Sequence, residues 1–146
     1  MLVSIVIPCY NSEHTIGEVV ELAIEEFKKL DNYECEFVLV NDYSRDGTWK
    51  AIEALADKHS NVKGINLAKN FGQHNAIMAA MSQAEGELIV GMDDDMQNHP
   101  SQIPQFLAKM EEGYDIVFGV FKERKFSVMK NITGAISRYL LWHLLD

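Results

Sequence analysis

Three consecutive aspartates, Asp93, Asp94 and Asp95, follow a hydrophobic run in the segment GELIVGMDDDMQNHP. Adjacent carboxylates repel one another, so a folded chain gains nothing from crowding them without a counter-ion. Carboxylate oxygens suit Mg²⁺ or Mn²⁺, which leave their other positions to water and substrate phosphates. Side chains alternate along an extended chain, so Asp93 and Asp95 should share one side. Gln97 could add an oxygen to the same ion. The alternative is a solvated acidic turn before the next helix.

Two other polar segments also follow apolar runs. Asp42, in VNDYSRDGTW, lies at the end of the first apolar run. Its carboxylate could accept a hydrogen bond from an imide N–H, the donor that uracil offers. The alternative for Asp42 is a helix cap. Lys69, in AKNFGQHNA, could neutralise a pyrophosphate as a point charge, and Gly72 precedes a helix whose N-terminus is a natural anion site.

Apolar periodicity predicts strands and helices that alternate along the chain, with short connections. The expected strands cover residues 3–8, 36–42, 62–67, 87–92 and 115–120, and the expected helices cover residues 16–30, 48–58, 75–85 and 103–112. Asn11 or Ser12 is the predicted cap of the first helix. This order predicts an α/β fold, a mostly parallel sheet with helices on both faces. Ligands bind at the carboxyl ends of such strands, so the polar residues should gather along one rim.

Composition excludes some functions. The net charge of −9 argues against a general nucleic-acid binder, and neither a GxGxxG nor a GxxxxGK[ST] motif is present. The two cysteines, without CxxC spacing, are expected to be buried reduced thiols of a cytosolic protein. No signal peptide is recognisable, and the sequence contains no run of about 18 apolar residues, the length needed to cross a bilayer.

The C-terminal part differs from the rest in charge. Residues 121–146 carry five Lys or Arg and two Asp or Glu, and their apolar residues lie at helical spacing. A basic amphipathic helix of this kind can lie in a membrane interface, and the alternative is a helix that packs on the domain or on a missing segment. The chain stops directly after an apolar run, so we expect a truncated protein.

The motifs, taken in this order, resemble glycosyltransferase family 2, the inverting nucleotide-sugar transferases of GT-A fold. SIVIPCYN is similar to the opening strand of the family, VNDYSRDGT to its V-D-D-G-S-x-D-G-T, LAKNFGQHNAI to its R-N-x-G segment, and MDDDMQNHP to its D-A-D-L-Q-x-P-P. Gln97 and Pro100 after the acidic triplet, with GVFKERKFSVMKNITG, resemble the polyprenyl-phosphate branch that includes dolichol-phosphate mannose synthase.

The resemblance implies a role for each matching position. The expected nucleotide-sugar site consists of Pro8, Tyr10, Asn11, Asp42, Lys69, Asp93 and Asp94, with Asp42 on the base. Asp93, Asp95 and Gln97 would hold Mg²⁺ or Mn²⁺ on the donor diphosphate. Asp95 and Arg124 are the expected catalytic residues, Arg124 by positioning the acceptor. Several positions depart from the family pattern: Ser12, Asn41, Tyr43 and Phe121, the last where the branch has an acceptor-binding Arg.

We therefore predict a nucleotide-sugar-binding GT-A domain over residues 1–120 and the start of an acceptor-binding or membrane-associated region over residues 121–146. The expected activity is inverting transfer from a UDP-sugar to a polyprenyl phosphate, at the cytoplasmic face of the membrane. The alternative acceptor is a saccharide hydroxyl in cell-surface polysaccharide synthesis. The chain lacks the acidic pair that a receiver-like Mg²⁺-binding signalling domain needs after its first strand. It also lacks the basic glycine-rich loop that a nucleotidyltransferase would have there.

Overall fold

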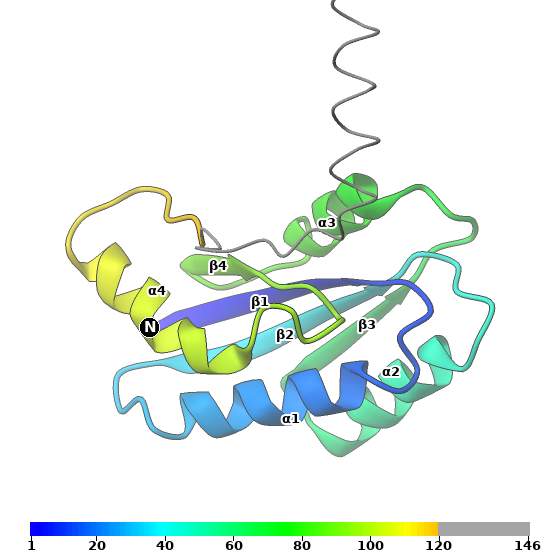
Figure 1. Ribbon diagram of the computed structural model, residues 1–146, viewed down its shortest axis with the longest axis horizontal. Helices are drawn as coiled ribbons and strands as arrows, with labels where there is room; N and C mark the ends of the chain where they lie inside the picture. Colours follow the sequence, from blue (N-terminus) through cyan, green and yellow to red (C-terminus); the bar gives the residue numbers. More distant parts are fainter. Residues whose placement is uncertain (120–146) are drawn as a thin grey trace, which may run out of the picture. The chain divides into compact units, whose positions relative to one another are not determined.

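The computed structural model describes residues 1–119, of which Met1–Asp115 form one compact unit. Four parallel strands make its sheet in the order β3-β2-β1-β4 (Figure 1): β1 (Leu2–Cys9), β2 (Glu34–Asn41), β3 (Val62–Asn66) and β4 (Leu88–Gly91). The chain builds outward from β1 to β3 and then returns to place β4 on the other side of β1. The order therefore reverses between β1 and β4, the place where α/β sheets bind ligands.

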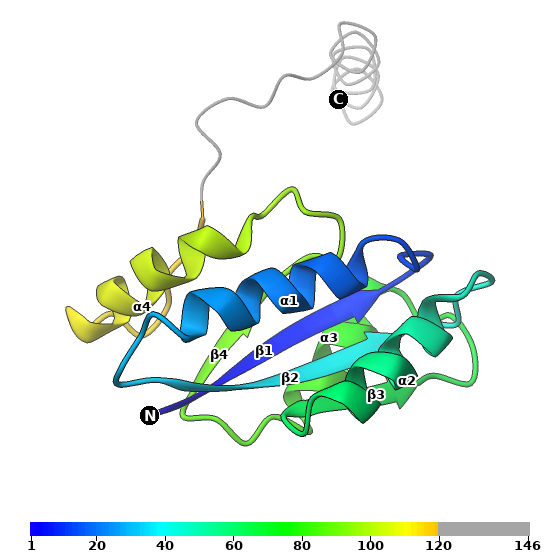
Figure 2. The same cartoon turned by 90° about the horizontal axis from the view of Figure 1, so that it is seen from below.

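Helices cover both faces of this sheet, as predicted. Figures 1 and 2 show α1 (Ile16–Phe27) and α2 (Thr48–Lys58) on one face and α3 (Gln73–Met81) on the other. A short 3₁₀ helix, η1 (Pro100–Gln102), leads into α4 (Ile103–Glu111), which packs beside α1. Within the described residues, no helix has the length and apolar character that a membrane span requires.

The alternating directions of strand side chains divide the core between the two faces. On the α1 side, Ile5, Ile7, Phe37 and Leu39 pack against α1, and all four are fully buried. On the α3 side, the core is smaller: Val6, Val38 and Val40 pack against Ala76 and Ala80. Both central strands are thus apolar on both faces, which explains the continuous hydrophobic runs in their sequences.

A buried carboxylate anchors the connection from α3 to β4 at the amino ends of the strands. Glu36, which is 6% exposed, accepts hydrogen bonds from the Ser4 hydroxyl at 2.5 Å and the Glu85 backbone N–H at 2.6 Å. Its other oxygen lies 3.1 Å from Lys63 Nζ. Burial raises the pKa of Glu36, but these hydrogen bonds outweigh burial and leave the pKa below its ordinary value. Gly86 has no room for a Cβ, which would lie 2.7 Å from the Ser4 backbone nitrogen.

We expect Glu36→Gln to lower the free energy of unfolding by about 1–3 kcal/mol at pH 7, because an amide cannot accept every hydrogen bond that the carboxylate accepts. Because the pKa of Glu36 is lowered in the folded state, its contribution is complete above the ordinary carboxyl pKa and disappears as the pH falls through the folded value. In urea unfolding between pH 7 and pH 3, the free energy of unfolding should fall more steeply in the wild type than in Glu36→Gln, beginning near pH 4.3. The control is Glu34→Gln at the exposed start of β2. If the free energies of unfolding of the wild type and Glu36→Gln differed by the same amount at every pH, the prediction would be contradicted.

Four local predictions were wrong. Helix α1 ends at Phe27 rather than at residue 30. Its N-cap is Thr15: Asn11 Oδ1 instead accepts the Arg45 N–H at 3.0 Å, and the Ser12 hydroxyl has no hydrogen-bond partner among the described residues. Helix α3 runs from Gln73 to Met81 rather than over 75–85, since the Glu85 N–H leaves the helix for Glu36.

The fourth wrong prediction is the strand expected over 115–120. Residues 115–119 form no strand, and β4 pairs only with β1 in the described part of the chain. An apolar β-branched run becomes a strand only where a neighbouring strand supplies its hydrogen bonds. The predicted amphipathic helix in 121–146 lies outside the described residues.

Candidate active site

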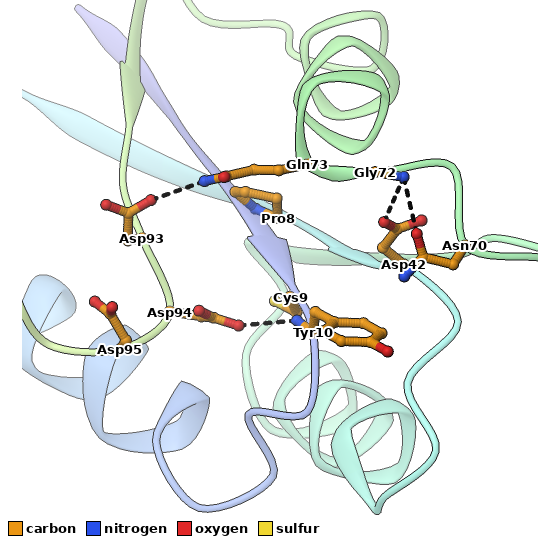
Figure 3. Close-up of a pocket in the computed structure, with 10 residues that line it drawn as sticks. All are labelled: Pro8, Cys9, Tyr10, Asp42, Asn70, Gly72, Gln73, Asp93, Asp94 and Asp95. Atoms are coloured by element: carbon orange, nitrogen blue, oxygen red, sulfur yellow. Dashed lines mark hydrogen bonds between the residues drawn. The ribbon is translucent and has the colours of Figure 1, made fainter. Parts of the chain in front are cut away.

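A cavity of about 330 Å³ opens at the carboxyl ends of β1, β2 and β4, where the strand order reverses. Such a volume suits a small-molecule ligand. Its lining comes from four places in the chain (Figure 3): the end of β1, the residue after β2, the start of α3 and the acidic loop after β4. The lining residues are Pro8, Cys9, Tyr10, Asp42, Asn70, Gly72, Gln73, Asp93, Asp94 and Asp95.

The three aspartates of the acidic loop have different neighbours. Figure 3 shows Asp93 reaching toward Gln73, Asp94 toward Tyr10 and Asp95 toward neither of them. Asp94 Oδ2 accepts the Tyr10 backbone N–H at 2.9 Å, which ties the acidic loop to the end of β1. Asp95 Oδ1 accepts the Gln97 N–H at 3.0 Å. Asp94 thus fixes the loop, and Asp93 and Asp95 stay the predicted pair of metal-binding carboxylates.

Asp42 closes the opposite side of the cavity and is 4% exposed. Its two oxygens accept the backbone N–H groups of Phe71 at 2.7 Å and Gly72 at 2.8 Å. Gly72 has a φ of +86°, a conformation that favours glycine. Asp42 thus fixes the loop before α3 while it lines the cavity. A carboxylate has about four lone-pair positions, so two remain for a ligand donor.

Reciprocal hydrogen bonds join the loop after β1 to the loop after β2. The Asn11 N–H donates to Ser44 Oγ at 3.0 Å, and the Arg45 N–H donates to Asn11 Oδ1 at 3.0 Å. The Gly47 N–H donates to Glu13 Oε2 at 2.6 Å, the same atom that a Cβ at position 47 would strike. This pair of joined loops, residues 10–15 and 42–48, carries Tyr10 and Asp42 to the cavity.

Asp46 and the two cysteines have shifted pKa values. Burial opposes ionisation of Asp46, but hydrogen bonds from the Thr48 hydroxyl at 2.6 Å and the Thr48 N–H at 3.1 Å lower the pKa of Asp46 overall. Asp46 thus accepts hydrogen bonds from the first residue of α2, whose N-cap is Gly47. Burial, together with the charge of Asp94, raises the pKa of the Cys9 thiol far above its ordinary value. Burial likewise raises the pKa of Cys35 to about 11, so both remain thiols without nucleophilic character at neutral pH.

The structure gathers most of the predicted site residues at the cavity. Those that line it are Pro8, Tyr10, Asp42, Asp93, Asp94 and Asp95. Asn11 and Gln97 do not line it, and neither does Lys69, whose ammonium lies 4.9 Å from the centre of the Phe71 ring. Arg124 lies outside the described residues.

Sequence reasoning missed Gln73 as a site residue. Gln73 is the first residue of α3, and its side-chain Nε2 donates to Asp93 Oδ1 at 3.1 Å. The available signal was its place directly after Gly72, at the start of a helix that begins on the ligand rim. Cys9 and Asn70 also line the cavity, although neither was assigned to donor binding, and Gly72 lines it beside the helix N-terminus that was expected to suit an anion.

The donor set fits a hard divalent cation. Asp93 and Asp95 offer carboxylate oxygens at the wall of the cavity, and Mg²⁺ typically takes one or two carboxylates together with substrate phosphates. In residues 1–119, no group of three or more His, Cys, Asp or Glu side chains is arranged to hold a metal ion. The phosphate oxygens of a ligand would supply the remaining positions.

Comparison with known proteins identifies the family. The model of "Glycosyl transferase family 2" matches residues 4–137. "Undecaprenyl-phosphate 4-deoxy-4-formamido-L-arabinose transferase" of Proteus mirabilis (strain HI4320) is 45% identical over 116 residues, which cover 79% of this chain and 35% of that protein. The protein of the same name from Shewanella sediminis (strain HAW-EB3) is 43% identical over 140 residues, 95% of this chain and 42% of that protein. The chain thus spans well under half the length of these relatives.

Solved structures agree with this assignment. The crystal structure of S. aureus TarS 1-349 matches with a TM-score of 0.60 and 28% identity, covering 84% of this chain and 40% of that one. Mannosyltransferase PcManGT from Pyrobaculum calidifontis, in complex with GDP-Man and Mn²⁺, matches with a TM-score of 0.55 and 28% identity, covering 64% of this chain and 27% of that one.

These likenesses confirm the predicted GT-A fold and the resemblance to the polyprenyl-phosphate branch. Nearly the whole chain matches the family model, and the parallel sheet with its acidic loop after β4 has the arrangement that the motifs predicted. This chain belongs to glycosyl transferase family 2.

Proposed function

We propose that the protein transfers a sugar from a UDP-sugar to a polyprenyl phosphate, with inversion at the anomeric carbon. The observation that carries this proposal is the cavity itself, with Asp42 and Tyr10 on one side and the Asp93–Asp95 carboxylates on the other. A nucleoside diphosphate needs both a polar pocket for its base and a site for its charged phosphates. The names of the curated relatives support the acceptor, since they are undecaprenyl-phosphate transferases.

The donor's base is expected on the Asp42 side. Asp42 keeps lone pairs free beside its two backbone hydrogen bonds and can accept the imide N–H of uracil. The exposed Tyr10 ring borders the same space and offers an apolar surface for a base. TarS has been crystallised with UDP and with UDP-GlcNAc, which favours uridine, whereas the PcManGT complex contains GDP-Man. Guanine also carries a ring N–H, beside its single carbonyl, so the test includes both nucleotides.

The diphosphate would lie toward the acidic loop, where Asp93 and Asp95 would hold Mg²⁺ or Mn²⁺. When bound, such a cation neutralises the diphosphate and makes the nucleoside diphosphate a better leaving group. Asp94 keeps the loop against β1 through the Tyr10 N–H, which holds the base side and the phosphate side of the cavity together. In the proposed site Asp95 acts through the metal, and Gln97, which was predicted as a third metal ligand, donates its backbone N–H to Asp95.

The nature of the acceptor decides which further group the reaction requires. A polyprenyl phosphate is already ionised at neutral pH, so it can attack the anomeric carbon without a strong general base. A basic residue such as Arg124 then needs only to position the phosphate. A saccharide hydroxyl would need a carboxylate to remove its proton. We further propose that the full-length protein works at the cytoplasmic face of the membrane, where a polyprenyl phosphate is anchored.

An assay of the full-length protein tests this function. UDP-sugars and GDP-sugars are offered with undecaprenyl phosphate or with an oligosaccharide, in Mn²⁺ or in EDTA, and products are identified by mass spectrometry. We expect a glycosylated undecaprenyl phosphate that forms only with a UDP-sugar and divalent metal, with an inverted anomeric configuration by NMR. Transfer to the oligosaccharide alone would overturn the acceptor, and transfer from GDP-sugars alone would overturn the base.

A further inference from the structure

Neutral amides hold the carboxylate of Asp93 from two sides. Gln73 Nε2 donates to Asp93 Oδ1 at 3.1 Å, as Figure 3 shows, and Asn98 Nδ2 donates to Asp93 Oδ2 at 2.9 Å. The hydrogen bonds to Asp94 and Asp95 come instead from backbone N–H groups. Within the described residues, Asp93 is therefore the only member of the triplet that other side chains orient.

The chemistry of these two donors suits a carboxylate that must bind a cation. A side-chain amide fixes the direction of the carboxylate without neutralising it, whereas Lys or Arg would bring a positive charge that competes with the cation. Two of about four lone-pair positions on Asp93 are occupied, so positions remain for a metal. Hydrogen-bond partners of metal ligands orient those ligands, and their loss typically weakens metal affinity by about 10–100-fold.

Gln73 also connects the two sides of the cavity. It follows Gly72, whose N–H donates to Asp42 Oδ2 at 2.8 Å, and its own side chain reaches Asp93 after β4. A continuous path thus runs from the end of β2, through the loop before α3, to the acidic loop. Asp42 fixes the backbone from which the Gln73 side chain starts.

We propose that Gln73 is a positioning residue that holds Asp93 in the orientation that binds the divalent cation. This proposal rests on the metal-dependent donor binding of the proposed function. Asn98 supports the second oxygen of the same carboxylate. Asp42 fixes the backbone of Gly72 and thereby the position of Gln73. The orientation of Asp93 on the metal side therefore depends on Asp42 on the nucleoside side.

Gln73→Met in the full-length protein is the direct test, because methionine keeps the length and helix preference of glutamine but has no donor. Two quantities are measured: the Mn²⁺ affinity of the UDP-bound protein, from the EPR signal of free Mn²⁺, and the UDP affinity in EDTA, by calorimetry. We expect Mn²⁺ to bind about tenfold more weakly, and UDP affinity in EDTA to stay within about twofold. The matched control is Gln83→Met, beyond the end of α3, where the amide's one hydrogen bond within residues 1–119 goes to the Ser82 carbonyl at 3.3 Å.

A second variant guards against misfolding of the first. Gln73→Asn keeps an amide but shortens its reach, so it should show the same selective loss of Mn²⁺ affinity. Wild-type Mn²⁺ affinity in a folded variant would overturn the proposal. So would an equal weakening of UDP binding in EDTA, which would assign Gln73 a structural role in the loop. If the wild type itself bound UDP without any dependence on Mn²⁺, the metal-dependent function would fail first, and the inference with it.

Discussion

Asp95→Asn should remove the metal-dependent part of UDP binding, lowering UDP affinity in Mn²⁺ by about a hundredfold or more, since a bound cation contributes several kcal/mol to phosphate binding. The substitution is close to isosteric. The asparagine oxygen can still accept the Gln97 N–H, which Asp95 accepts at 3.0 Å, so the loop should keep its shape. Only the charge and one metal-binding oxygen are lost. Binding in Mn²⁺ should therefore fall to the level that the wild type shows in EDTA.

Calorimetry of the full-length protein measures both conditions on each variant. Asp57→Asn is the matched control, because Asp57 is an exposed aspartate on α2, away from the cavity. If UDP affinity in Asp95→Asn still differed between Mn²⁺ and EDTA as much as in the wild type, the metal would have to be held without Asp95. The predicted pair of Asp93 and Asp95 would then be wrong. Sugar transfer should fall by a comparable factor, because the same interaction supports departure of the nucleoside diphosphate.

Asp42→Asn should affect both folding and nucleotide binding. An asparagine can accept only one of the two backbone N–H groups that Asp42 now accepts at 2.7 Å and 2.8 Å, and its NH₂ group would face the other. We expect a loss of about 1–3 kcal/mol in the free energy of unfolding, because a charge-assisted hydrogen bond is lost and the NH₂ group faces another donor. UDP affinity in EDTA should fall about tenfold or more, because the base loses a charged acceptor and the loop before α3 is loosened.

The matched control for this variant is Asn70→Ala. Asn70 Oδ1 accepts the same Gly72 N–H at 3.1 Å, but from an exposed side chain, so its loss should change stability by less than about 0.5 kcal/mol. Urea unfolding and calorimetry in EDTA separate the two effects. If Asp42→Asn and Asn70→Ala lowered the free energy of unfolding equally, the loop before α3 would not depend on the charged acceptor of Asp42.

The alternation of strands and helices was predictable because each element carries its own local pattern. The runs over 3–8 and 36–42 are apolar on both faces, as buried parallel strands must be, and they became β1 and β2. The position of the acidic triplet followed from the same reasoning, since carboxyl ends of parallel strands meet at one rim.

Contacts between distant parts of the chain were not predictable from these patterns. The hydrogen bonds of Asp42 reach 29 and 30 residues along the sequence, and the bond from Gln73 to Asp93 reaches 20. No periodicity reports which backbone N–H a carboxylate will meet. The expected cap on α1 failed for the same reason, because Asn11 bonds to a loop 34 residues away. The strand expected over 115–120 depended on a partner that apolar content cannot reveal.

The joined loops after β1 and β2 also limit how this site can change in evolution. Asn11, Glu13 and Gly47 each take part in bonds that require a specific partner in the opposite loop, so a single substitution breaks a pair rather than altering one side chain. Variation there must be concerted, and it will be slow. New donor preferences should therefore arise first among residues whose side chains enter the cavity without holding the loops, of which Tyr10 is the clearest case.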